Sequence, residues 1–216
     1  MAARRYFPDE KKTRSLQLDY KSISLNTKWI KSGLDSIIYR ESMDSTLDIA
    51  LNKDYQAQDF KKVVVTDNQT SGQGTHGKKW ISTPYKDLTF SLILGRDYYF
   101  EQNLIDQCCI GMLNVLSTYN IEGQIKYPND IYVNNKKIIG MLLSNVQNSR
   151  ESNKPYQALS IGINVNSVID IKKLDSQAKV SSTSLFLELN REINREKLLK
   201  LIIEEIDLII QKLVHQ

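Results

Sequence analysis

Histidine and cysteine are both scarce in this chain, which contains two of each among its 216 residues. The histidines, His76 and His215, stand far apart in the sequence, so no Ser-His-Asp triad is visible. The cysteines, Cys108 and Cys109, are neighbours that cannot easily bridge to each other or complete a metal-ligand set with two histidines. We therefore expect no disulfide framework, no structural metal and a reducing, cytoplasmic compartment.

Long apolar runs are also missing, since no stretch reaches the roughly 18 residues that a membrane span requires. The N-terminus lacks the apolar core of an export signal. With 41% hydrophobic and 25% charged residues, the composition is typical of a soluble globular protein. The length suits a single domain with a substantial core, and no membrane association is expected.

Positive charge is in modest excess, with a formal net charge of +4, which does not by itself demand a nucleic-acid partner. We interpret residues 1–34 as a basic N-terminal extension. Its cluster of basic residues is interpreted as a solvated, partly disordered tail, the alternative being an arm that touches nucleic acid. The basic residues concerned are Arg4, Arg5, Lys11, Lys12 and Arg14.

Hydrophobic periodicity predicts an α+β fold in one domain. Helices are expected over 104–116 and 198–213, after Thr46, and from a cap at 181–183 through Leu189. Strands are expected at 35–40, 61–66, 88–94, 125–133, 137–146 and 158–165, with a polar loop at 148–153. Consecutive hairpins imply a mixed, largely antiparallel sheet that is backed by helices on one face.

Three of the nine glycines, Gly72, Gly74 and Gly77, lie within six residues of an irregular stretch over 68–80. Glycines allow backbone N–H groups to approach an anion closely, as in a phosphate-cradling loop. No helical pattern follows the stretch, so a dinucleotide-binding unit is not indicated.

A second irregular stretch combines Lys126 to Asp130 (KYPND) with Lys136 to Gly140 (KKIIG). It interrupts two strand-like runs with a proline, an asparagine and a glycine. Alone, the first part reads as a plain turn and Lys137 as an edge-strand lysine. The density of charge and irregular backbone indicates a functional site instead.

These two stretches resemble the catalytic domain of biotin protein ligases, whose loop reads approximately GRGRRGRxW and whose second signature reads KWPNDxxxxxxKxxG. Asp44 to Thr46 (DST) and Gly162 to Asn166 (GINVN) match two further blocks of that family. Order and spacing fit along the chain. The resemblance implies a catalytic domain over 35–216 with the class II synthetase-like fold of the biotin/lipoyl ligase superfamily.

The implied reaction joins the carboxylate of biotin to the α-phosphate of ATP, releases pyrophosphate, and passes biotin from biotinyl-5'-AMP to a lysine of a biotin carboxyl carrier domain. Negative charge gathers at one phosphorus, so fixed cations are the residue type required. By the resemblance, Lys137 clamps carboxylate and phosphate, Lys126 lies near the phosphates, and Asp130 lies near Mg²⁺ or orients the attacking lysine.

The resemblance also assigns binding residues. For Ser45 and Thr46 the rival interpretation is a helix cap, and for Trp80 it is a buried core residue. The residues implied for biotin are Ser45, Thr46, Gln69, Gly72, Gln73, Gly74, Thr75, Lys137 and Gly140. Those implied for ATP are Gly74, Thr75, His76, Lys78, Trp80, Lys126, Asn129 and Asn164.

The glycine-rich loop departs from the family pattern, because Gln73 and Thr75 stand at arginine positions. In the family, the arginine at the position of Thr75 helps to retain the adenylate. We hypothesise that this chain binds biotin and ATP but holds the intermediate loosely. His76 compensates only when it is protonated.

About 35 residues precede the part of the chain that resembles the catalytic domain. A winged-helix repressor domain has roughly sixty residues, so DNA binding is disfavoured. A small C-terminal β module is expected to be absent, and a homodimer along a sheet edge is an option. The competing interpretations are a degenerate biotin-binding regulator and a lipoyl or octanoyl ligase of the same fold. The KYPND block favours biotin, since the lipoyl-type RRxxGGG loop is absent.

Overall fold

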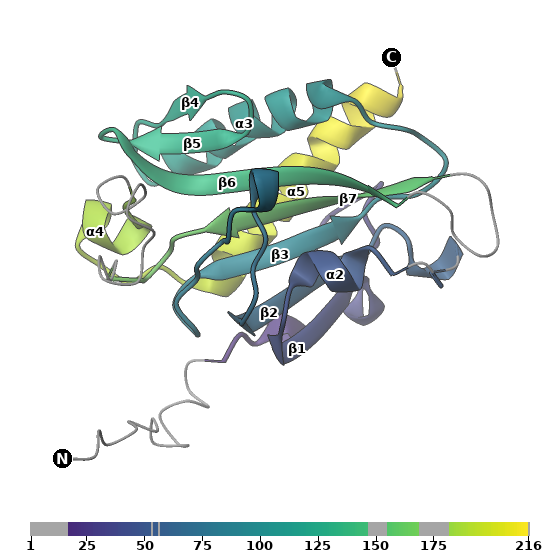
Figure 1. Cartoon of the computed structure of the whole chain (residues 1–216), viewed down its shortest axis with the longest axis horizontal. Coiled ribbons are helices and arrows are strands. Elements are labelled where there is room, and N and C mark those ends of the chain that lie inside the picture. The colour runs from purple at the N-terminus through teal and green to yellow at the C-terminus, as the bar shows by residue number, and fades with distance from the viewer. Residues whose placement is uncertain (1–16, 53, 56, 147–154, 169–181, 216) are drawn as a thin grey trace.

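The computed structural model describes residues 17–52, 54–55, 57–146, 155–168 and 182–215 (Figure 1). Within this part, seven strands form one sheet in the order β1-β2-β3-β7-β6-β5-β4. β1 pairs with β2 in parallel, and all other neighbours are antiparallel. The strands are β1 Ile37–Met43, β2 Val63–Gln69, β3 Leu88–Ile93, β4 Gln124–Lys126, β5 Asp130–Val133, β6 Lys136–Val146 and β7 Tyr156–Ile163. The predicted α+β fold with a mixed, largely antiparallel sheet is confirmed.

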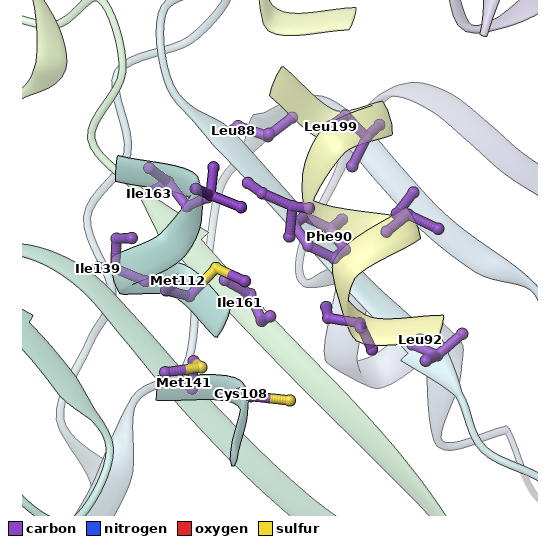
Figure 2. Close-up of a cluster of buried hydrophobic side chains, with 14 of the residues drawn as sticks. Leu88, Phe90, Leu92, Cys108, Met112, Ile139, Met141, Ile161, Ile163 and Leu199 are labelled. Atoms are coloured by element: carbon purple, nitrogen blue, oxygen red, sulfur yellow. The ribbon is translucent and has the colours of Figure 1, made fainter. Parts of the chain in front are cut away.

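Two long helices, α3 Gln102–Ser117 and α5 Arg195–Val214, cover one face of the sheet (Figure 1). Alternation along β3 points Leu88, Phe90 and Leu92 toward this face, where they meet side chains of both helices (Figure 2). These contacts form the main core, and they bury the apolar stripes that the sequence places on both helices.

A short helix, α2 Thr46–Ala50, lies on the opposite face of the sheet (Figure 1). Leu47 of this helix joins Met43, Val64 and Tyr156 in a second, smaller apolar cluster. The helical layer predicted for one face therefore consists of α3 and α5, while α2 covers apolar strand residues on the other face.

Local details differ from the predicted boundaries. A turn over residues 127–129, which contains the cis Tyr127–Pro128 peptide, divides the expected strand at 125–133 into β4 and β5. Helix α4 (Leu185–Leu189) is capped by Ser184, whose Oγ accepts the Leu187 N–H at 3.2 Å, one residue beyond the predicted cap. The predicted loop at 148–153 lies outside the described residues.

Short 3-10 helices are η1 Tyr20–Ser22, η2 Leu34–Ser36, η3 Ala57–Asp59 and η4 Thr75–Gly77. None of the described helices combines the length and apolar character that crossing a bilayer demands.

Residues 17–33, the described part of the predicted N-terminal extension, pack on the domain. The segment is held because its apolar side chains enter the main core beside α5. The basic residues from Arg4 to Arg14 lie outside the described part of the chain. The buried side chains of the segment are Leu18, Ile23, Leu25 and Ile30.

The segment is also fixed by Asp207 of α5, whose buried carboxylate accepts the backbone N–H groups of Lys28, Trp29 and Ile30 at 2.7–2.9 Å. Asp207→Ala is expected to lower the free energy of unfolding by about 2–4 kcal/mol, because these donors lose their acceptor. Urea denaturation measures the change. Asp97→Ala, at a side chain that is 81% exposed, should change it by less than about 0.5 kcal/mol. Equal effects of both substitutions would contradict the proposed anchor.

Candidate functional site

A small cavity lies on the α2 side of the sheet, where β3, β6 and β7 meet the loop that follows β2. Its volume of about 40 Å³ has room for a few water molecules. Residues from five separate stretches of the sequence come together in its wall, at 45–47, 69–80, 89, 129–142 and 160–162. Of the residues predicted to bind or react, it is lined by Ser45, Thr46, Gln69, Gln73, Gly74, Thr75, Trp80, Asn129, Asp130, Lys137 and Gly140.

The glycine-rich loop closes on itself as a narrow hairpin with η4 at its tip. The Trp80 N–H donates to the Gly72 carbonyl at 2.9 Å, and the Gly74 N–H donates to the Lys78 carbonyl at 2.7 Å. Gly77 adopts a φ of 71°, a left-handed conformation that favours glycine. The hairpin brings the loop back to the sheet at Trp80.

Two aspartates tether this loop, Asp44 before α2 and Asp48 within it. The Gln73 Nε2 donates to Oδ1 of Asp48 at 2.7 Å, and the Thr70 hydroxyl donates to Oδ1 of Asp44 at the same distance. The Asp48 contact is notable because Gln73 stands at one of the two arginine positions of the expected loop. The side chain that contacts this carboxylate is therefore a neutral amide and not a charged group.

The indole of Trp80 lies directly on the sheet. It covers Gly140 and Gly162, which are paired across β6 and β7. A Cβ added at Gly140 would lie 2.9 Å from Cζ3 of the indole, and one at Gly162 would lie 2.6 Å from Cζ2. The indole Nε1 is buried and has no hydrogen-bond partner. Trp80 is thus both a packed residue and part of the cavity wall, so the two interpretations of this residue are compatible.

One ion pair provides the charge of the cavity. The Lys137 ammonium lies 2.6 Å from Oδ1 of Asp130 and 5.5 Å from the centre of the Trp80 ring. Asn129 fixes the adjoining turn, because it exchanges hydrogen bonds with Met141, through its Nδ2 at 2.5 Å and its carbonyl at 2.9 Å. Both charged side chains are less than one third exposed, so their attraction is only partly screened.

The α2 end of the cavity is polar. Ser45 caps the helix by accepting the Leu47 N–H at 3.2 Å, and it also lines the cavity. The Thr46 N–H donates to Oε1 of Gln69 at 2.9 Å. Because a backbone N–H can only donate, this contact fixes which end of the Gln69 amide is oxygen.

Some predicted residues lie outside the cavity wall. The Lys126 ammonium lies 4.7 Å from the centre of the Tyr132 ring, at the edge of the sheet. Asn164 is buried and donates to the Thr183 carbonyl at 2.9 Å, a contact that holds the chain before α4. Of His76, the structure places only the backbone, within η4. The predicted residues that do not line the cavity are Gly72, His76, Lys78, Lys126 and Asn164.

Thr89, Ser160 and Gly162 line the cavity but were not predicted as site residues. The sequence carries a signal for them, since polar or small residues alternate with apolar ones along 88–93 and 159–163. The sequence does not show that these positions lie on the same face of the sheet as the glycine-rich loop. Only the fold shows it. The apolar wall that was also missed consists of Leu47, Met141, Leu142 and Ile161.

The cysteines contribute no nucleophile to the cavity. Burial raises the pKa of both thiols, that of Cys109 to about 11, so they stay protonated near neutral pH. Within the described residues, no three His, Cys, Asp or Glu side chains gather closely enough to hold a metal ion.

Residues 39–166 match the model of the Biotin/lipoate A/B protein ligase family. Two curated relatives are each named Bifunctional ligase/repressor BirA. The protein from Bacillus spizizenii is 28% identical over 74% of this chain and 49% of its own length. The protein from Bacillus subtilis is 29% identical over 60% of this chain and 40% of its own length. This chain therefore spans about half the length, or less, of these relatives.

Solved structures give the same fold. A biotin protein ligase from Aquifex aeolicus in complex with biotin and ATP superposes with a TM-score of 0.69 and 24% identity, covering 82% of this chain and 71% of that chain. A biotin protein ligase from Leishmania major in complex with biotinyl-5-AMP superposes with a TM-score of 0.62 and 21% identity, covering 82% of this chain and 75% of that chain. At these identities the likeness establishes the architecture alone.

The contact between Trp80 and the paired glycines can be tested by fluorescence, since Trp29 is the second of two tryptophans. In a Trp29→Phe background, Gly162→Ala is expected to push the indole off the sheet and shift its emission to longer wavelength. Gly95→Ala is the control, because a Cβ there would meet its nearest atom at 3.6 Å. Unchanged emission in the Gly162 variant would rule out the close contact.

Proposed function

We propose, since the chain belongs to the Biotin/lipoate A/B protein ligase family, that it is an ATP-dependent biotin protein ligase. It forms biotinyl-5'-AMP and pyrophosphate, and then transfers biotin to a lysine of a biotin carboxyl carrier domain. The observation that carries the proposal is the meeting, in one cavity, of the glycine-rich loop with the Lys137–Asp130 pair and the polar Thr46–Gln69 group.

In the first half-reaction, a carboxylate oxygen of biotin attacks the α-phosphorus of ATP and pyrophosphate leaves. Both reactants are anionic, so a cation between them lowers their repulsion and stabilises the charge that develops at phosphorus. Lys137 is suited to this role, because Asp130 holds its ammonium at the wall of the cavity.

In the second half-reaction, the amine of the acceptor lysine attacks the acyl carbon and AMP leaves. The amine must lose a proton to complete the amide. Asp130 is the carboxylate in the cavity wall and is suited to orient that amine. Lys126, at the edge of the sheet, is suited to the outer phosphates or to the carrier surface.

Mg²⁺ is expected to accompany ATP. The cavity offers it Asp130 and no gathered set of three acidic or histidine ligands within the described residues. This fits an ion that keeps several water molecules and binds mainly through phosphate oxygens.

The volume of the cavity is far below the roughly 300 Å³ at the lower end of ordinary ligand pockets. Binding therefore requires Trp80 and the loop to move from the sheet. The tether between Gln73 and Asp48 is one of the contacts that must release or shift. We infer that loop opening is part of substrate entry.

Lipoyl or octanoyl transfer is the second candidate, because the matching family model includes lipoate ligases. A weakened biotin-binding regulator is a further option that Thr75 favours. For the whole protein, we propose that the acceptor is a biotin carboxyl carrier domain and that the protein acts in the cytoplasm. A homodimer along a sheet edge is an option within this proposal.

The proposed reaction is tested by biotin-dependent exchange of labelled pyrophosphate into ATP. Lys137→Ala is expected to reduce the exchange about 100-fold or more, because the developing charge loses its cation. Lys136→Ala, at the neighbouring exposed lysine, should leave it nearly unchanged. Exchange with lipoate but not with biotin would replace the biotin assignment by the lipoyl one.

Retention of the adenylate is tested by separating free biotinyl-5'-AMP from protein after one turnover. The native chain is expected to release it readily, and Thr75→Arg to slow the release about ten- to hundredfold, since a charge-assisted contact is restored. Thr75→Gln is the control, because it lengthens the side chain without adding a charge. Full retention by the native chain would refute the loose-binding hypothesis.

A further inference from the structure

Strand β6 contains a β-bulge at the end of the cavity that carries the ion pair. Ile131 of β5 is paired with Ile139 of β6, but the next residue of β5, Tyr132, is paired with Lys137. Between these two pairs, β6 therefore has one residue more than β5. The extra residue is Ile138, which is fully buried in the main core.

The bulge determines the direction of the Lys137 side chain. Residues two apart in a regular strand point to the same face of the sheet. Ile139 and Met141 belong to the main core on the α3 and α5 face (Figure 2), so regular alternation would send Lys137 there as well. Its ammonium instead lies by the Trp80 ring and 2.6 Å from Asp130, in the cavity on the other face. The extra residue shifts the alternation by one position and so brings the lysine into the cavity.

Thr183 and Asn164 hold the backbone of the bulge. The Thr183 N–H donates to the Lys137 carbonyl at 2.9 Å, and the Asn164 N–H donates to the Ile138 carbonyl at 3.0 Å. Thr183 and Asn164 are also joined to each other, because the Asn164 Nδ2 donates to the Thr183 carbonyl at 2.9 Å. Both residues are buried. The direction of Lys137 thus depends on the segment that leads into α4, far away in the sequence.

Glu188 of α4 connects this segment to the end of the β5–β6 hairpin. Its Oε1 accepts the Thr183 hydroxyl at 2.5 Å, and its Oε2 accepts Nδ2 of Asn134 at 2.8 Å. Asn134 and Asn135 form the two-residue turn of the hairpin, and both have positive φ angles, of 48° and 61°. One carboxylate therefore holds both the support of the bulge and the tip of the hairpin.

We propose that Glu188 is a positioning residue for the ligase reaction, and that it acts through Thr183 and Asn134 to keep Lys137 aimed into the cavity. The inference rests on the proposed function and deepens it. Glu188 does not line the cavity, so it acts only through the residues that it holds. A small displacement of the lysine is costly, because a misplacement of about 1 Å can slow a reaction about 100-fold.

The experiment measures kcat and KM for biotin in pyrophosphate exchange. Glu188→Ala is expected to lower kcat about ten- to hundredfold with a smaller change in KM, because the charge that the lysine stabilises develops in the transition state. Glu188→Gln should keep most of the activity, since its oxygen can accept from Thr183 and its NH₂ can donate to Asn134 once that amide is turned. Glu192→Ala is the matched control, because its exposed ion pair lies outside the hairpin, and it should leave kcat unchanged.

A double variant separates positioning from a general effect on the fold. In a Lys137→Ala background, Glu188→Ala should lower kcat little further, since no cation remains to be aimed. If Glu188→Ala folds poorly, Asn134→Gly removes the other contact at an exposed turn residue and allows the positive φ. It should lower kcat in the same direction. Unchanged kcat in Glu188→Ala and Asn134→Gly, or effects of Glu188→Ala and Lys137→Ala that multiply in full, would overturn the proposal.

A second measurement does not depend on the reaction. In a Trp29→Phe background, Glu188→Ala and Lys137→Ala should change the emission of Trp80 alike, because each removes the ammonium from its place 5.5 Å from the ring centre. A change in the Lys137 variant without one in the Glu188 variant would contradict the proposal. Absence of exchange in the native chain would overturn the proposed function, whereas the emission would still decide whether Glu188 positions Lys137.

Discussion

Antiparallel pairing of β6 with β7 places Gly140 opposite Gly162, so no side chain projects from this part of the sheet into the space above it. Every other feature of the cavity depends on that flat surface. The indole of Trp80 can lie on the sheet, and the glycine-rich loop can close over it. Lys137, three residues before Gly140 on β6, reaches the same space. A side chain at either glycine would collide with the ring, and the loop would have to lift.

The same sheet serves two purposes because its two faces are used differently. On the face toward α3 and α5, apolar side chains form the main core (Figure 2). The apolar side chains of the N-terminal segment belong to the same core. On the other face, α2 covers the apolar part and leaves polar residues beside the glycines. The rigid core thus holds the site groups in place, while the loop that closes the cavity is attached by a few hydrogen bonds that can be released.

Charge in the cavity is balanced before any ligand arrives. Lys137 and Asp130 form a close pair, and Asn129 fixes the turn that carries the aspartate. A partly buried lysine without a partner would be costly, so the pair keeps the cation available at low energetic cost. An anionic ligand can then compete for the ammonium, which links substrate binding to a rearrangement of the pair.

The sequence by itself determined the α+β class, the long helices and the stretches that meet in the cavity, because periodicity and the spacing of glycine, lysine and aspartate are local properties. Tertiary structure decided what depends on partners distant in the chain. The packing of residues 17–33 depends on Asp207 and on the core beside α5, which lie far away in the sequence. Asn164 matches a family block, yet its amide is committed to Thr183. Lys137 would face the main core by regular alternation, and it enters the cavity because the bulge at Ile138, which Thr183 helps to hold, shifts the pattern. Register and packing are long-range outcomes of burying one face of a sheet, and no local pattern of residues specifies them.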